Sequence, residues 1–144
     1  MRLRYPVCDL RAFLSGPWRI ARRIHDARQG LIGRLAGLGI FAPAPQGLAY
    51  DENGLLRFGG YQGEATRRYL FAFDQTDAAV VRHADDSLFH RLNLSAGKDD
   101  IQHQCAEDYY RGRYRVLDEN RFVTIWDVTG PRKRYRMATL YTRN

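Results

Sequence analysis

Residues 18–25 read WRIARRIH, and the period of two in this stretch decides the fold. Trp18, Ile20, Arg22 and Ile24 fall on one face of an extended chain, and the residues between them fall on the other. Because side chains alternate between the two sides of a strand, we expect one face to be buried and the other to contact water. The stretch is therefore predicted to form the first strand of a sheet.

Further segments of extended character follow, separated by turn residues. The expected strands cover residues 18–25, 31–41, 48–50, 55–58, 65–73, 79–83, 87–94, 101–117, 121–129 and 132–142. Asn53-Gly54 is the strongest hairpin signal, and glycines at 33, 37 and 39 indicate bends or close backbone approach. A short helix over residues 9–15, with Asp9 as its N-cap, is expected to precede the first strand.

These elements predict an all-β chain, because about ten strands follow one short N-terminal helix. Closing such strands into a barrel buries one face of each and removes the exposed edges. Evenly spaced hairpins favour an antiparallel, up-and-down path of the calycin type. With 144 residues and no linker of low complexity, we expect one β-barrel domain over residues 1–144. A two-sheet sandwich is the alternative architecture.

The chain is basic, with 23 Lys and Arg against 16 Asp and Glu and a net charge of +7. Lys98 and Lys133 are the only lysines, so arginine carries almost all of this charge. The arginines are spread along the chain, often at alternate positions, which favours a solvated strand face over one functional patch. Binding of nucleic acid or an acidic protein through these arginines is an alternative function that is not favoured.

Cys8 and Cys105 have neither a CxxC spacing nor the pattern of a disulfide-rich scaffold. A reduced, cytoplasmic protein is therefore expected, with no membrane span and no signal peptide. The most apolar stretch, residues 31–45, is short and interrupted by glycines. No cofactor is implied, and the sequence is compatible with a homodimer.

Gly16-Pro17-Trp18 follows the expected helix and opens the first strand. This segment resembles the Gly-x-Trp signature of calycin-type barrels, which include the lipocalins and the fatty-acid-binding proteins. The resemblance implies that Gly16 and Trp18 belong to the barrel floor and that a late arginine packs across the tryptophan. Arg132 and Arg134 are the candidates for that arginine, and Arg134 is assigned to the floor.

A second resemblance covers most of the chain. The segment 13–19, FLSGPWR, followed by Arg22-Arg23-Ile24, is similar to the opening of the uncharacterised DUF6314 family. Its later parts resemble residues 89–90, residues 103–105 with Asp108 and Tyr109, and residues 126–133. The resemblance supports the extent of the domain and implies no reaction.

His103, Cys105 and Tyr109 are expected on one face of the strand over residues 101–117. His90 lies on the preceding strand, and we expect it to approach His103 if the two strands pair. Two imidazoles and a thiolate are ligands for zinc, and a His–Cys pair can form an activated nucleophile. The H-x-C spacing is not a strong zinc signature, however. Packed barrel residues are the favoured interpretation, and no metal site is predicted.

Asp108 is a candidate general base, although an ion pair with an arginine is favoured. The turn Gly130-Pro131-Arg132-Lys133 resembles an anion-binding turn, with a plain hairpin turn as the favoured alternative. Trp126 and Tyr135 belong to a larger set of aromatic residues that are expected to line a cavity. The set is Tyr50, Tyr69, Phe71, Phe73, Tyr109, Tyr114, Trp126, Tyr135 and Tyr141.

The leading functional hypothesis is a β-barrel that holds a small amphipathic or anionic molecule in its interior. Eight residues are candidates for ligand binding: His90, His103, Cys105, Asp108, Tyr109, Trp126, Arg132 and Tyr135. An enzyme that uses His90 or His103 as acid and base in the same cavity is the second hypothesis. It requires these histidines and Asp108 to meet in one pocket.

Overall fold

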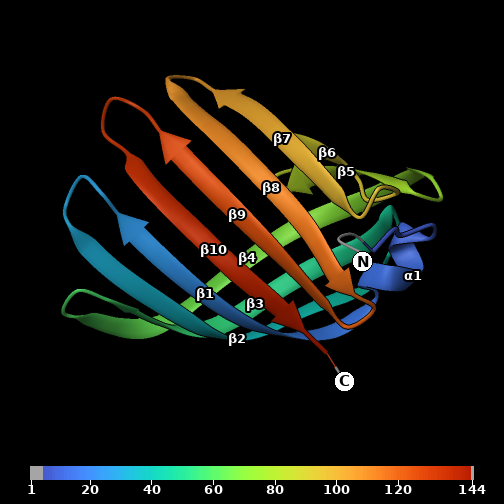
Figure 1. Cartoon of the computed structure of the whole chain (residues 1–144), viewed down its shortest axis with the longest axis horizontal. Coiled ribbons are helices and arrows are strands. Elements are labelled where there is room, and N and C mark those ends of the chain that lie inside the picture. The colour runs from blue at the N-terminus through green and yellow to red at the C-terminus, as the bar shows by residue number, and fades with distance from the viewer. Residues whose placement is uncertain (1–4, 144) are drawn as a thin grey trace.

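Ten antiparallel strands form one sheet, as the alternating sequence pattern predicts (Figure 1). The computed structural model describes residues 5–143. The elements are α1 (Leu10–Leu14), β1 (Gly16–Asp26), β2 (Leu31–Ala44), β3 (Gly47–Phe58), β4 (Tyr61–Gln75), β5 (Ala78–His83), β6 (Leu88–Asn93), β7 (Lys98–Cys105), β8 (Asp108–Asp118), β9 (Arg121–Thr129) and β10 (Arg134–Thr142). No helix within residues 5–143 has the length and apolar character needed to cross a membrane.

The strands follow an up-and-down path that closes almost completely into a barrel. Their order is β6-β5-β4-β3-β2-β1-β10-β9-β8-β7, so the first strand pairs with the last and the edges are β6 and β7. Side chains join these two edges: the Asn93 backbone N–H donates to the Asp99 carboxylate at 2.9 Å. Phe89 of β6 also packs against Tyr110 and Trp126 of the opposite wall. The predicted barrel is therefore confirmed, with one side-chain seam.

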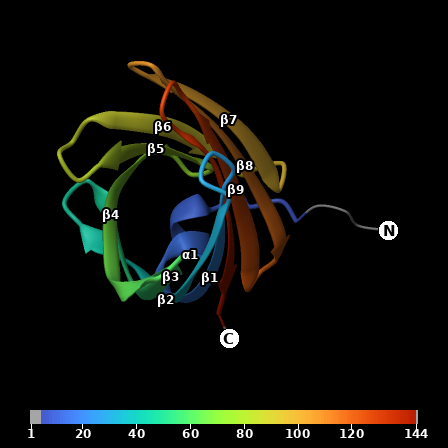
Figure 2. The ribbon, with the colours of Figure 1, turned by 90° about the vertical axis from the view of Figure 1, so that its left-hand side faces the viewer.

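α1 covers one end of the barrel, and Figure 2 shows it inside the outline of the ring of strands. Asp9 caps the helix by accepting a hydrogen bond from the Ala12 N–H at 3.0 Å, as expected for an N-cap. Leu10, Phe13 and Leu14 are its buried residues. Trp18 is fully buried beneath them and donates its indole N–H to the Leu14 carbonyl at 2.7 Å. This end is the floor of the barrel.

The arginine that packs on Trp18 is Arg143, whose guanidinium carbon lies 4.1 Å from the ring centroid. The expectation that Arg132 or Arg134 does so is wrong. Both sit beside the β9–β10 turn, at the end of the barrel away from α1, and both are exposed (Figure 1). Arg143 instead follows β10 at the floor and donates to the carbonyls of Phe13 and Glu119.

β3 is one continuous strand, so the expected turn over residues 51–54 is wrong. Gly54 pairs with Gly37 of β2, and a Cβ at Gly37 would lie 2.1 Å from the Asn53 carbonyl oxygen. Asn53-Gly54 therefore marks the close backbone approach that the glycines of residues 33–39 predict, and the chain does not reverse there. The reversal comes at Gly59, whose φ of +60° suits a turn glycine.

Residues 101–117 form two strands and not one bent strand. The chain reverses between Cys105 and Asp108, which pair across a two-residue turn at Ala106 and Glu107. Ala106 adopts φ +53° there, a left-handed conformation that alanine seldom takes. The turn lacks the Asn-Gly or Asp-Gly pair that identifies such hairpins in a sequence, which is why it was not predicted.

Candidate functional site

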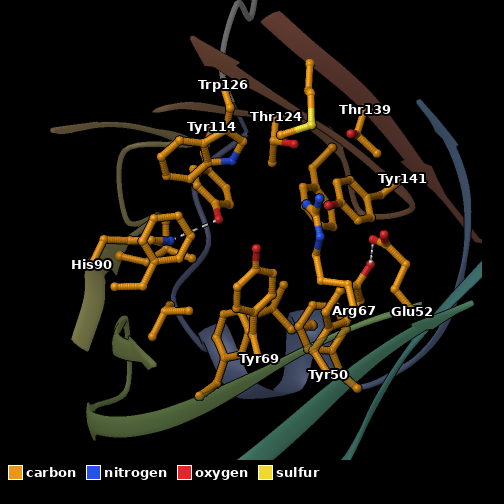
Figure 3. Close-up of a pocket in the computed structure, with 18 of the residues that line it drawn as sticks. Tyr50, Glu52, Arg67, Tyr69, His90, Tyr114, Thr124, Trp126, Thr139 and Tyr141 are labelled. Atoms are coloured by element: carbon orange, nitrogen blue, oxygen red, sulfur yellow. Dashed lines mark hydrogen bonds between the residues drawn. The ribbon is translucent and has the colours of Figure 1, made fainter. Parts of the chain in front are cut away.

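The inward side chains of the barrel enclose a chamber between the floor and the open end (Figure 3). Its free volume is about 40 Å³. Aromatic side chains form most of the wall, together with a few polar groups. The lining residues that carry polar or aromatic groups include Arg22, Tyr50, Glu52, Arg67, Tyr69, Phe89, His90, Tyr114, Thr124, Trp126, Thr139 and Tyr141. The lining combines apolar surface with a few convergent polar groups, and the free volume admits only a few water molecules unless side chains move.

A buried ion pair lies in the chamber wall between β1 and β3. Arg22 donates two hydrogen bonds to the Glu52 carboxylate, at 2.6 and 2.7 Å, and its Nε donates to the Thr139 hydroxyl at 2.7 Å. The Tyr50 hydroxyl donates to the same carboxylate at 2.6 Å. Burial acts to raise the pKa of Glu52, but the hydrogen bonds and charge of Arg22 outweigh it and lower that pKa below its ordinary value. The pair is thus charged and fully satisfied.

Arg67 lies near this pair but is not part of it. It is half-buried on β4, and its guanidinium points into the chamber in Figure 3. Its closest aromatic neighbour is Tyr69, with 5.9 Å between the guanidinium carbon and the ring centroid. Within residues 5–143 it has no hydrogen-bond or ion-pair partner among the side chains and carbonyls. Arg67 is the cross-strand partner of Glu52, whose pKa its charge helps to lower, but the Glu52 carboxylate forms its direct ion pair with Arg22. Arg67 therefore brings to the chamber a positive charge that makes no direct ion pair within the described chain.

His90 and Tyr114 form a second polar pair in the wall, at the opposite side of the chamber from Glu52 (Figure 3). The His90 Nδ1 lies 2.8 Å from the Arg91 carbonyl oxygen, which can only accept, so Nδ1 carries the proton. Its Nε2 then accepts from the Tyr114 hydroxyl at 3.4 Å. Burial lowers the pKa of His90 to about 4 and raises that of Tyr114 well above its ordinary value. Both groups are neutral near pH 7.

Three histidines surround the Phe89 ring at the seam between β6 and β7. The ring centroids of His83, His90 and His103 lie 4.6, 4.7 and 5.6 Å from that of Phe89. The expected approach of His90 and His103 depended on pairing of their strands, and β6 and β7 are instead the two unpaired edges of the described sheet; both histidine rings contact Phe89. Within the described residues, no group of three or more His, Cys, Asp and Glu side chains is arranged to hold a metal ion.

The tight turn after β7 changes the neighbours of His103. Tyr110 pairs with His103 and faces inward, so the expectation that Tyr109 shares its face is wrong. Tyr109 pairs with Gln104 and lines an outer groove. Cys105 ends β7 as an exposed free thiol. Neither side chain reaches the chamber.

Asp108 lies beside the β9–β10 turn and not against the histidines. Its carboxylate forms an ion pair with Lys133 at 3.1 Å. The Gly130 N–H donates to the Lys133 carbonyl at 2.9 Å, so the turn over residues 130–133 satisfies its own backbone as an ordinary hairpin turn. Arg132 is exposed on this turn. The meeting of His90, His103 and Asp108 that an acid–base enzyme requires is not seen.

Of the eight candidate residues, His90 and Trp126 line the chamber. Tyr135 is half-buried at the open end, where Arg67 and Tyr110 influence its pKa, which burial raises. The polar residues that sequence reasoning missed are Arg22, Glu52 and Arg67. Alternation places Arg22 with Trp18 and Ile20, and Arg67 with Tyr69 and Phe71, so both signals were present. Glu52 gives no such signal, because it falls between the expected strands 48–50 and 55–58, in the segment that Asn53-Gly54 marks as a turn.

A ten-strand meander, a short helix over one end, and a tryptophan under an arginine on the floor define a lipocalin-like, calycin-type β-barrel. Among solved structures, the S-type phycobiliprotein lyase CPES from Guillardia theta is similar, with a TM-score of 0.63 and 9% sequence identity. The likeness covers 98% of this chain and 94% of that one. A protein of unknown function from the DUF3598 family of Nostoc punctiforme matches with a TM-score of 0.58 and 11% identity, over 96% of this chain and 49% of its own length.

The family itself is settled by sequence. The profile of DUF6314, a family of unknown function, matches residues 14–143, and the chain belongs to this family. A search of curated proteins found no match. At identities this low, the solved structures show a shared fold and carry no activity to this chain.

Proposed function

We propose that this protein binds a small amphipathic molecule in the barrel chamber, with an anionic group of the ligand against Arg67 and its apolar part against the aromatic wall. The single observation that carries the proposal is Arg67. Every other charged group of the chamber is neutralised, since Arg22 is held by Glu52 and His90 is uncharged. Arg67 faces Glu52 across the strand pair but makes no direct hydrogen bond to its carboxylate, which Arg22 and Tyr50 occupy. A partly desolvated guanidinium without such hydrogen bonds is costly to a fold, whereas an incoming carboxylate, sulfonate or phosphate satisfies it with charge-assisted hydrogen bonds.

The solved structures offer support of a general kind. The similar barrel from Guillardia theta is a phycobiliprotein lyase, so this fold occurs in a protein that acts on another molecule. In this chain the aromatic residues stand around the space that a ligand would occupy. Phe89 and Trp126 stack with 5.0 Å between ring centroids, and Tyr50 and Tyr69 are nearly parallel. Such a wall suits an apolar or aromatic ligand body.

The free volume sets a condition on binding. About 40 Å³ holds a few water molecules, whereas pockets for drug-sized ligands measure roughly 300–1,000 Å³. Arg67 and Met137 are the flexible side chains of the lining. We therefore expect both to change rotamer when a ligand enters. A ligand-bound crystal structure with Arg67 turned onto the anionic group is the direct check.

A fluorescent anion with an apolar body provides the test. We expect 1-anilinonaphthalene-8-sulfonate to bind the wild-type protein and to bind the Arg67→Gln variant about tenfold more weakly. Arg68→Gln is the matched control, because Arg68 lies next in the chain, faces outward and pairs with Asp51. Its affinity for the dye is expected to equal that of the wild type.

An uncharged analogue separates charge recognition from the shape of the chamber. N-phenyl-1-naphthylamine, which lacks the sulfonate, is expected to bind the wild type and Arg67→Gln equally. Equal affinity of both arginine variants for the sulfonate overturns the role of Arg67. Failure of both dyes to quench Trp126, measured in a Trp18→Phe background that remains folded by circular dichroism, overturns chamber binding altogether.

We also propose that the protein acts in the cytoplasm. Cys8 and Cys105 are exposed free thiols, which persist in a reducing compartment. Cell fractionation with an antibody against the native protein tests this, and recovery from a membrane or secreted fraction contradicts it.

A further inference from the structure

Three arginines stand side by side on the outer wall of the barrel. Arg23 of β1 is the direct cross-strand partner of Arg34 of β2, and Arg34 is the direct partner of Arg57 of β3. All three are exposed, and within residues 5–143 none has an ion-pair or hydrogen-bonding carboxylate. Arg68, Arg91 and Arg136 each pair with an aspartate, whereas Arg19, Arg111, Arg132 and Arg134 are exposed without one in the described part of the chain. The three arginines are therefore distinguished by their direct cross-strand adjacency. We call these three residues the arginine row.

An apolar row runs parallel to the arginine row, and the two rows are two residues apart on each of β1, β2 and β3. It crosses five neighbouring strands in register, from β9 through β10, β1 and β2 to β3. In Figure 1 the strands β9, β10 and β1 lie side by side. The members of the apolar row are Val123, Leu140, Ala21, Ala36 and Leu55. The small alanines in the centre lie between the larger leucines, and residues of both rows line one shallow groove.

Folding does not explain the arginine row. Like charges directly opposite each other on neighbouring strands repel, and the repulsion lowers the free energy of unfolding. The apolar row adds Leu140 and Leu55, which are 38% and 40% exposed to solvent. Two features that both oppose the stability of an isolated barrel lie next to each other. A partner that covers both removes both costs.

We propose that this outer face binds an amphipathic, acidic helix of a partner protein, laid across strands β10 to β3. Adjacent strands lie about 4.8 Å apart, so the arginine row spans about 10 Å with charges every 5 Å. Acidic residues at positions i, i+3 or i+4 and i+7 of a helix are spaced about 5–6 Å apart, which matches. The apolar stripe of the same helix then lies in the alanine-floored groove, with the acidic edge on the arginine row.

The same observations disfavour the other occupants. Single-stranded nucleic acid is held by exposed aromatic rings between basic groups, and the two rows contain no aromatic residue. A flat anionic membrane does not enter the shallow groove that the two rows line. A second copy of this chain related by a two-fold axis brings one arginine row toward another, with a net charge of +7 on each chain. The site is separate from the chamber, because Arg22 points inward and Arg23 outward.

The probe is a synthetic helical peptide of about 20 residues with leucines at heptad spacing and one flanking stripe of glutamates. We expect fluorescence anisotropy to show binding to the wild-type protein that weakens as salt is raised. The Arg34→Glu variant is expected to bind at least about tenfold more weakly, because the charge is reversed at the centre of the row. Arg11→Glu is the matched control, since Arg11 is exposed on α1, far from both rows.

A second substitution tests the apolar half of the site. Leu140→Asn is expected to weaken the peptide several-fold without changing the net charge. Thermal unfolding of all variants shows whether they fold, and Arg34→Gln, which matches Glu in size but carries no charge, replaces Arg34→Glu if that variant unfolds. The peptide with the glutamates moved to the apolar face is expected not to bind.

Four outcomes overturn the proposal. They are equal binding of the two peptides, equal effects of Arg34→Glu and Arg11→Glu, tighter Arg34-dependent binding to phosphatidylglycerol vesicles or an oligothymidylate than to the peptide, and an Arg34-dependent dimer in analytical ultracentrifugation. Dye binding in the chamber is measured on the same variants. It is expected to be unchanged, so that loss of one site is not mistaken for loss of the other.

Discussion

The two ends of this barrel each place an arginine over aromatic rings, yet the two arginines have opposite surroundings. At the floor, Arg143 lies over Trp18 and donates hydrogen bonds to carbonyls from α1 and from the β8–β9 turn. At the open end, Arg67 lies over Tyr69 and has no such partner within the described residues. The floor arginine closes a structure, whereas the arginine of the open end makes no direct ion pair in the described chain, and for this reason we propose a binding role for it. The comparison teaches that two arginines over aromatic rings differ in whether their guanidinium groups have hydrogen-bond partners within the chain, and this difference is the basis for assigning them different roles.

The largest expected loss of stability comes from a substitution in the wall between the two ends. Glu52→Gln leaves Arg22 buried without its counter-charge, and we expect a loss of about 3–5 kcal/mol in the free energy of unfolding. Urea denaturation measures it, with the exposed Glu64→Gln as control. The double variant Arg22→Met/Glu52→Leu is expected to recover most of the loss. A loss below about 1 kcal/mol for Glu52→Gln alone would mean that Arg22 does not need the Glu52 charge in this wall.

The pH dependence of stability comes next in size. The folded pKa of His90, about 4, lies below the ordinary value near 6.5, so the unfolded chain binds a proton more readily. Stability is therefore fully present above pH 6.5 and falls as pH drops from about 6.5 to about 4, by about 3 kcal/mol. Denaturation at several pH values should show a smaller fall for His90→Gln. The part that remains is expected from His83, whose pKa burial also lowers.

Arg143→Ala tests the floor. It removes the stacking on Trp18 and the hydrogen bonds to carbonyls, and we expect a loss of about 1–2 kcal/mol. Arg143→Lys keeps the charge but not the forked donors, so an intermediate value is expected. If the alanine variant is as stable as the wild type, Arg143 does not hold the floor closed.

Arg67→Gln has the smallest expected effect on stability. With no hydrogen bond to lose, the free energy of unfolding should stay within about 0.5 kcal/mol of the wild type or rise slightly. Thermal and urea unfolding, measured beside Arg143→Ala, make the comparison direct. A loss as large as that of Arg143→Ala would place both arginines in the same structural role.

Much of the fold could be predicted from local sequence. The alternation of residues 18–25, the helix cap at Asp9 and the strand over residues 121–129 all agree with the structure. Two errors cancelled in the expected number of strands. Residues 48–58 were divided at Asn53-Gly54, and residues 101–117 were joined across Ala106-Glu107. At Asn53-Gly54 the backbone stays extended because it packs closely against Gly37, and at Ala106-Glu107 it reverses through a left-handed alanine. Local sequence propensity predicts neither.

The candidate site was predicted less completely. His90 and Trp126 were found because their side chains lie in the inward phase of correctly placed strands. Tyr109 was assigned to the wrong face because a missed turn shifts every later residue of the strand. Arg132 and Arg134 are the arginines expected at the floor, but it is the other end of β10, followed by Arg143, that meets α1, and strand direction relative to the helix is not a local property of the sequence.

The sequence by itself determined that this chain alternates, that its strands are joined by short turns, and that Trp18 follows a short helix. These are properties of neighbouring residues, fixed by side-chain period and turn chemistry. Only the tertiary structure decided which charges meet. Arg22 meets Thr139 on the paired strand β10 and Glu52 two strands away on β3. Arg143 packs on the floor, and Arg67 makes no direct ion pair within the described residues although Glu52 is its cross-strand partner. The physical reason is that ion pairing across a barrel depends on strand register and direction, which no local pattern specifies.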